Sequence, residues 1–204
     1  MKRFWTADDH LGNAEITRFC HRPWLKKGDL KDDGTWTSEA TALDCADRSA
    51  KGIIRNSNSR VKTEDMVMCV GDFMNYGLVK GVPGLRLKAE DYLKQLNGTW
   101  IIIEGNHDRN NTVKTVARHM FVEIGGYRVF VSHYPTDNAA QDPELMAYVR
   151  KTCAFAICGH VHDRWQTRFD GILMNINVGL DVNKYAPIHD AEVLNIFEKA
   201  KKAK

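Results

Sequence analysis

The feature that most constrains this chain is a short apolar run followed at once by a polar cluster, a pattern that occurs five times. Short apolar runs between polar segments predict strands. In α/β proteins, functional side chains lie just past the C-terminal ends of such strands. The sequence therefore predicts a fold in which five strand ends bring Asp, Asn and His side chains together. The five runs span residues 4–7, 66–70, 100–103, 127–131 and 154–158.

Helices are predicted in several of the gaps between these strands. In residues 38–55, apolar positions recur at helical spacing behind a possible Thr37 or Ser38 cap. Residues 85–96, 142–150 and 190–200 are also predicted as helices.

The later part of the chain favours hairpins. Gly125-Gly126 predicts a hairpin turn between residues 121–124 and 127–131, and residues 172–178 predict a further strand. Helices between the early strands and hairpins between the later ones indicate a mixed α/β architecture with more than one sheet.

Length and composition exclude several classes of protein. The 204 residues suffice for one domain, which we expect to span residues 1–204. Lys and Arg number 29 against 26 Asp and Glu, and this net charge of +3 excludes a histone-like polycation. No apolar stretch approaches the roughly 18 residues of a membrane span. Five cysteines without a Cys-x-x-Cys pair are typical of a reduced, cytoplasmic protein.

The polar clusters together offer two carboxylates, four imidazoles and one amide oxygen. Such mixed nitrogen and oxygen ligands suit Mn, Fe, Zn or Co, whereas Ca and Mg prefer oxygen alone. Seven ligands are too many for one zinc ion with an open position, but they fit two ions that share a carboxylate, about 3.5–4 Å apart. Three histidines outside the clusters, His21, His119 and His189, are interpreted as surface or structural. The candidate ligands are Asp8, His10, Asp72, Asn106, His133, His160 and His162.

The ordered motifs resemble those of the calcineurin-like metallophosphoesterases. Residues 16–24 and 177–182 look like a small, cap-less bacterial and phage-type branch, and the resemblance runs from about residue 4 to about residue 188. It implies a two-sheet β-sandwich flanked by helices, a four-layer α/β/β/α fold. The motifs that carry it are Asp8-x-His10, Gly71-Asp72, Gly105-Asn106-His107-Asp108, Ser132-His133 and Gly159-His160-x-His162.

The resemblance also implies a role for each matched residue. One metal would be bound by Asp8, His10, Asp72 and His162, and the second by Asp72, Asn106, His133 and His160, with Asp72 bridging. His107 would face the leaving group as an acid or as a stabiliser of its charge.

Two departures from the family pattern stand out. Many members read Gly-Asp-x-x-Asp-Arg, in which the second Asp orients the catalytic His and the Arg holds phosphate. Here Asn75 and Tyr76 occupy those positions, and we expect both to contact the substrate. We also expect Asn75 to meet His107 without a full charge. The branch often carries His where this chain has Asn13.

These expectations lead to a metal-dependent hydrolase of phosphate esters. Metal-bound hydroxide would attack phosphorus in line, and His107 would assist the leaving oxygen. We expect two divalent ions, with Mn first and Fe, Zn, Ni or Co as alternatives. Tyr76 brings no cation for the extra negative charge of a monoester, so phosphodiesters are the expected substrates. Arg18 and Arg22 are the candidate substrate contacts that could supply the missing positive charge.

Several alternatives remain open from the sequence. A nuclease would use the same chemistry on DNA or RNA, and the aromatic and basic residues 18–24 could serve it, although we favour a helix end that packs Phe19 and Trp24 into the core. A phosphomonoesterase is the second alternative. A non-catalytic scaffold is disfavoured because His107 and all seven ligands remain, and a structural zinc protein because the ligand set holds no thiolate. The expected partner is a phosphate ester, including a nucleotide or nucleic acid, and no membrane.

Overall fold

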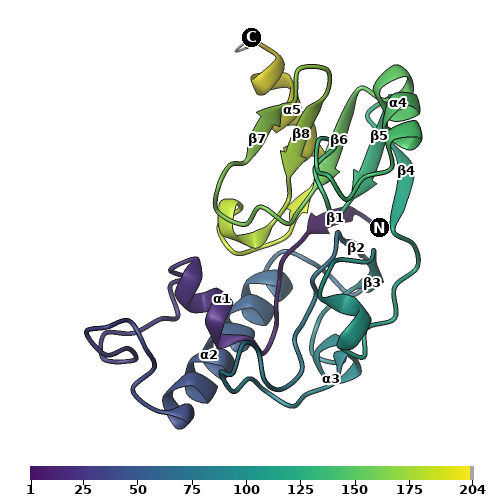
Figure 1. Cartoon of the computed structure of the whole chain (residues 1–204). Helices are drawn as coiled ribbons and strands as arrows, with labels where there is room; N and C mark the ends of the chain where they lie inside the picture. The colour runs from purple at the N-terminus through teal and green to yellow at the C-terminus, as the bar shows by residue number, and fades with distance from the viewer. Residues whose placement is uncertain (203–204) are drawn as a thin grey trace.

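The computed structural model describes residues 1–202 as two sheets with helices around them (Figure 1). The expected domain of residues 1–204 stays a prediction, and its last two residues lie outside the described part. Within residues 1–202, no helix has the length and apolar character that crossing a membrane requires.

The first sheet carries three of the predicted strands in parallel. Its order is β3-β2-β1-β9, with β9 antiparallel to β1 at one edge. Because β1, β2 and β3 are parallel, their C-terminal ends meet at one edge, as the motif pattern predicts. The strands are β1 (Arg3–Thr6), β2 (Met66–Cys69), β3 (Thr99–Ile102) and β9 (Ile188–His189).

The second sheet is mixed, with order β4-β5-β6-β8-β7. Its central strands β5, β6 and β8 run parallel, and β4 and β7 pair antiparallel at the two edges. The β4–β5 pair confirms the hairpin at Gly125-Gly126. The strands are β4 (His119–Ile124), β5 (Tyr127–Ser132), β6 (Phe155–Cys158), β7 (Thr167–Phe169) and β8 (Met174–Asn177).

The helices complete the layers. In Figure 1, α2 (Glu39–Asn58) and α3 (Ala89–Leu93) lie on the side of the first sheet away from the second, beside α1 (Ala14–Phe19). Helices α4 (Pro143–Thr152) and α5 (Asp190–Lys202) lie with the second sheet, and α5 also contacts β1 and β9. This arrangement confirms the predicted mixed α/β fold with two sheets flanked by helices.

Side-chain alternation along the strands explains why the sheets stack. In β5, Val129 and Val131 belong to the large core cluster shared by both sheets, whereas Phe130 between them packs with Met146 and Val149 of α4. Successive side chains of a strand point to opposite faces, so a continuous apolar run buries both faces of its sheet.

Two predicted elements differ from the observed ones in length. The helix expected over 85–96 is only Ala89–Leu93, because the Leu85 backbone instead pairs with Gly12 and Gly77. The strand expected over 172–178 begins only at Met174. The Asp170 carboxylate accepts the N–H groups of Ile172 and Leu173 and so holds these two residues in a turn. The short strands β7 and β9 escaped the sequence analysis because they hold few apolar residues.

Gly52 offers a test of the packing between α2 and the segment after α1. A Cβ at Gly52 would lie 2.0 Å from Trp24 Nε1, so Gly52→Ala forces the indole away. We expect Gly52→Ala to lower the free energy of unfolding in urea by about 1–3 kcal/mol, although alanine favours an uncrowded helix by about 1 kcal/mol. Lys51→Ala, on the exposed side of α2, is the control and should change little. A Gly52→Ala protein more stable than the parent would show that the indole does not pack there.

Candidate metal centre

All of the predicted ligands meet at the C-terminal ends of strands from both sheets. The segment after β1 carries Asp8 and His10, the segment after β2 carries Asp72, and the segment after β3 carries Asn106. The segments after β5 and β6 add His133, and His160 with His162. The prediction that these strand ends converge is therefore confirmed by the fold.

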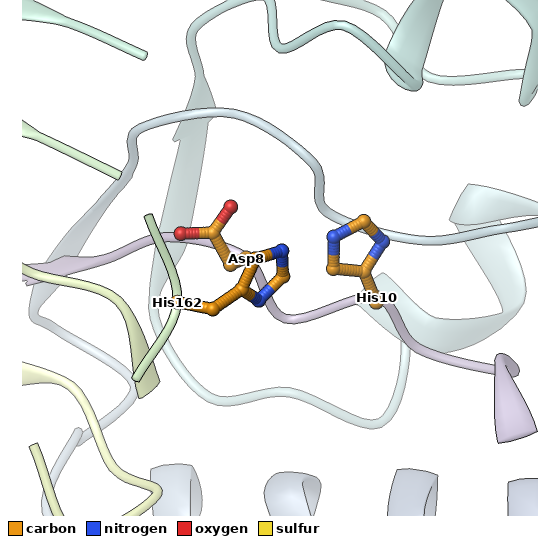
Figure 2. A group of neighbouring side chains, drawn as sticks. All are labelled: Asp8, His10 and His162. Atoms are coloured by element: carbon orange, nitrogen blue, oxygen red, sulfur yellow. The ribbon is translucent and has the colours of Figure 1, made fainter. Parts of the chain in front are cut away.

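The first group of ligand atoms comes from Asp8, His10 and His162. One ligand atom from each lies within 4.8 Å of the others. Figure 2 shows the three side chains gathered where the segment after β1 passes the segment after β6, and the two imidazole rings stack at a centroid distance of 5.2 Å. The backbone N–H of His160 donates to both Asp8 oxygens, at 3.1 and 2.9 Å, which holds the carboxylate in place.

Asp72 connects this group to a second one. Its Oδ2 atom lies 3.5 Å from His10 Nε2 and 3.4 Å from His133 Nε2. The amide oxygen of Asn106 lies 3.0 Å both from His133 Nε2 and from His160 Nδ1. Asp72 thus lies between two clusters of nitrogen and oxygen atoms, where a bridging carboxylate would have to lie.

A chain of hydrogen bonds fixes the tautomer of His10. Asn13 caps α1, and its Oδ1 accepts the N–H groups of Glu15 and Ile16, so its Nδ2 is the atom that donates to Asn75 Oδ1 at 3.0 Å. Asn75 Oδ1 is therefore an acceptor, and it accepts from His10 Nδ1 at 2.7 Å. With its proton on Nδ1, His10 presents the lone pair of Nε2 to Asp72.

These residues fit a bound metal ion. Among residues 1–202, His10 Nε2 is one of the few buried side-chain polar atoms without a hydrogen-bond partner. A buried orphan nitrogen lone pair beside a carboxylate is unfavourable unless a cation lies between them. Gly105 shapes the same space, since a Cβ there would lie 2.2 Å from Asp72 Oδ1. The mixed nitrogen and oxygen donors suit a transition metal rather than Ca or Mg.

The pKa values describe how protons compensate these charges. Burial lowers the pKa of His10 to about 3, so its ring is neutral. Burial also opposes charge on His133, but a hydrogen bond to Asp72 and the nearby Asp8 outweigh it and raise the pKa to about 9. At His162 burial is likewise outweighed, chiefly by Asp181, and the pKa rises to about 10. Metal binding must therefore displace protons from His133 and His162.

Behind the first group lies a buried ion pair that the sequence analysis missed. Arg22 donates through Nε to Asp181 Oδ1 at 2.8 Å, and its Nη2 donates to the Asp8 carbonyl at 2.7 Å. Asp181 Oδ2 lies 3.2 Å from His162 Nδ1, which leaves His162 Nε2 for a metal. The two residues are 159 positions apart in the sequence, so no local pattern predicts the pair. Only the family resemblance over 177–182 pointed to the segment that contains Asp181.

Arg22 is therefore not the substrate contact that we expected. Its side chain is fully buried, and its N–H groups donate to Asp181 and to backbone carbonyls. Arg18 also turns elsewhere, pairing with Glu15 at 2.7 Å and donating to the Gly34 carbonyl.

Asn75 differs from the expectation, whereas the role of Tyr76 is not tested. Asn75 is buried and contacts His10, so the expectation that it meets His107 is wrong, and so is its place among substrate contacts. Tyr76 is 42% exposed, and its role toward substrate stays a prediction.

The interpretation of Phe19 as a core residue is wrong as well. Phe19 is 52% exposed, with Arg18 and Lys80 over its ring. Trp24, in contrast, packs partly buried against the core beside α2, as expected.

His107 occupies the exposed edge of the centre. Its ring is 43% exposed, Nε2 lies 4.0 Å from Asp72 Oδ2, and its backbone N–H donates to Asp72 Oδ1 at 2.8 Å. The ring is thus near the bridging position yet open to solvent, whereas the His10 ring beside it is buried. This placement suits proton transfer to a bound molecule more than ligation.

Comparison with known proteins agrees with this geometry. A relative from Methanocaldococcus jannaschii, an uncharacterized protein, is 25% identical over 203 residues, covering 98% of this chain and 93% of the relative. The crystal structure of a protein of unknown function from Aquifex aeolicus superposes with a TM-score of 0.62 at 21% identity, covering 96% of this chain and 98% of that one. This second likeness shows the fold alone. A model of the calcineurin-like phosphoesterase superfamily domain matches residues 49–184, well over half of the chain. With Asp72, Asn106, His107, His133, His160 and His162 all inside that match, the chain belongs to the calcineurin-like phosphoesterase superfamily.

Proposed function

We propose that this protein is a dinuclear-metal-dependent phosphoesterase that hydrolyses phosphodiesters in preference to monoesters. The observation that carries the proposal is the position of Asp72 between two groups of nitrogen and oxygen ligands, with His107 at the exposed edge. The superfamily supports phosphate-ester chemistry, and the substrate class is inferred from the charges around the centre.

The two groups of ligands would each hold one divalent cation. Asp8, His10 and His162 would bind the first, Asn106, His133 and His160 the second, and Asp72 both. Two such ions supply Lewis-acid stabilisation of phosphoryl oxygens and a water of lowered pKa. Manganese is our first assignment, with Fe, Zn, Ni or Co also compatible with imidazole and carboxylate ligands.

The protein residues would orient the phosphate and move one proton. His107 is the exposed imidazole nearest Asp72, so it would donate a proton to the leaving oxygen. Its backbone N–H donates to Asp72 Oδ1, which ties the segment that carries the ring to the proposed bridging carboxylate. Asn111 supports the same segment by donating to the His107 carbonyl.

The proposed preference for diesters follows because the expected substrate contacts supply no free positive charge to the phosphate. Arg22 is buried against Asp181, Arg18 pairs with Glu15, and Tyr76 is uncharged. None of these three positions therefore supplies a free guanidinium for the extra oxygen of a monoester dianion, whereas a diester anion needs none. A nuclease would be a diesterase of the same kind, but the Phe19 ring already has two cations over it, which opposes base stacking there.

All five cysteines are free thiols, which agrees with a reducing compartment. We therefore assign the protein to the cytoplasm as part of this proposal.

Asp72→Asn and His162→Ala test the two-metal centre. Asp72→Asn should lower the occupancy of both metals, because the bridging carboxylate loses its charge, whereas His162→Ala should empty mainly one site. Elemental analysis after Mn²⁺ loading measures this, with two ions per parent chain expected. Asp33→Asn, on an exposed loop, is the matched control and should retain both ions. A fully active parent protein with one ion or none would contradict the dinuclear assignment.

His107→Ala tests the proton donor. The variant should keep both metals and lose roughly 10²- to 10⁴-fold in kcat, the usual scale of general acid catalysis. His189→Ala, on β9 and outside the centre, should retain full activity. Loss of metal from His107→Ala would identify His107 as a ligand and overturn its assigned role.

Substrate class is tested with two substrates that release p-nitrophenolate. We expect kcat/KM to be higher for bis-p-nitrophenyl phosphate than for p-nitrophenyl phosphate under one metal, because Arg18, Arg22 and Tyr76 supply no free cation for a dianion and Arg109 and Arg118 both approach Glu104. A preference for the monoester by about tenfold or more would mean that another cation reaches the phosphate.

A further inference from the structure

A cavity of about 440 Å³ opens directly beside the second group of ligands. Asn106, a candidate ligand, lies in its wall, and residues before and within α4 also line it. Cavities of this size accommodate organic molecules rather than single ions. Neither the family motifs nor the proposed chemistry gives this cavity a role.

Tyr134 joins the cavity to the metal centre. Tyr134 lines the cavity, and its ring packs edge-to-face on His133 and His160, at centroid distances of 5.3 and 4.7 Å. A group attached to a phosphate at the centre would therefore pass Tyr134 as it enters the cavity. His119, which has a planar ring, and the apolar residue Leu145 also line the cavity.

The charges in the cavity wall balance. Arg109 and Arg118 both approach Glu104, whose Oε1 lies 2.8 Å from Arg109 Nε and 3.4 Å from Arg118 Nε. Asp142 is the second carboxylate, and it is engaged as the N-cap of α4. The wall holds two guanidinium groups and two carboxylates, so it offers no net charge for a second phosphate. A neutral substituent is favoured over an anionic one.

The polar groups of the wall suit hydrogen bonding to such a substituent. Gln141 Nε2 donates to Ser132 Oγ at 3.1 Å and to the Tyr134 carbonyl at 2.8 Å. These bonds fix the amide, so its oxygen is the acceptor left for a ligand. The wall thus combines aromatic surface with fixed polar groups, the mixture that a base and a sugar require.

We propose that this cavity is the subsite for the organic substituent that a phosphodiester retains, and that it takes an uncharged group with a planar ring, such as a nucleoside. Tyr134 is the residue that separates large from small substituents. This inference rests on the proposed phosphodiesterase activity and extends it to substrate class.

Two diesters with the same leaving group test the proposal in the Mn²⁺-loaded protein. Thymidine 5′-(p-nitrophenyl phosphate) carries a nucleoside, and methyl p-nitrophenyl phosphate carries only a methyl group. The parent protein should prefer the thymidine ester in kcat/KM. Tyr134→Ala should reduce that ratio by about tenfold or more, since stacking of a base on an aromatic ring has an effect of this size. Tyr134→Phe, which keeps the ring, should preserve the ratio.

A second pair of variants avoids the contact of Tyr134 with the ligand histidines. Ala140→Trp would fill the cavity from an exposed position and should also lower the ratio, whereas Ala139→Trp, exposed and outside the cavity wall, should not. Thymidine alone should bind the metal-free parent protein in titration calorimetry and should not bind Ala140→Trp.

The outcomes separate the subsite from the activity. An unchanged ratio in Ala140→Trp, or a parent protein that prefers the methyl ester, would overturn the subsite. Failure of the parent protein to hydrolyse either ester would overturn the proposed activity, and thymidine binding would then decide the subsite independently.

Discussion

The centre depends on one buried carboxylate that is neither a candidate ligand nor a candidate acid. Asp108 accepts the N–H groups of Asp72 at 2.9 Å, Phe73 at 3.1 Å and Gly105 at 2.8 Å. These bonds join the segment after β2 to the segment after β3. Strand pairing ends at the edge of the sheet, so it does not fix these two segments relative to each other. The segment that carries Asp72 and the segment that carries His107 are held together because both are tied to Asp108. Gly105 makes this approach possible, since any side chain there would collide with Asp72.

A second constraint is the backbone conformation of the ligands. Five candidate ligands adopt left-handed φ values between 46° and 70°, a region that residues other than glycine rarely occupy. Each such residue costs of order 1–3 kcal/mol, and the surrounding structure must fix it. Bonds from His10 N–H to the Asp72 carbonyl and from Asp8 N–H to the Gly71 carbonyl provide that support at one side of the centre. These left-handed residues lie in the segments that follow β1, β2 and β6. The five residues are Asp8, His10, Asp72, His160 and His162.

Local pattern predicted the parts of this protein that depend on neighbours in sequence. Apolar runs located the strands, and their ends located the candidate ligands, because parallel strands share one edge. Pattern could not predict contacts set by packing between distant segments. The spacing of Asn75 does not say which imidazole it meets, and the structure puts it against His10 because Asn13 caps α1 beside it. The burial of Arg22 likewise depends on Asp181, far along the chain.

The two halves of the proposed centre differ in what supports their imidazoles, and this difference has a consequence for the metals. His162 Nδ1 faces the Asp181 carboxylate, whereas His133 Nδ1 donates to the Val70 carbonyl and His10 Nδ1 to the Asn75 amide. A carboxylate partner makes an imidazole a stronger ligand than a neutral acceptor does. The Asp181 charge is itself shared with Arg22, which also donates to the Asp8 and Asp9 carbonyls and so fixes the segment that carries two ligands. In the proposed centre, the half with Asp8 and His162 therefore has the more strongly supported ligands. The half with Asn106 offers a neutral amide and adjoins the cavity, so the more weakly held of the two proposed cations would lie on the side where substrate would enter.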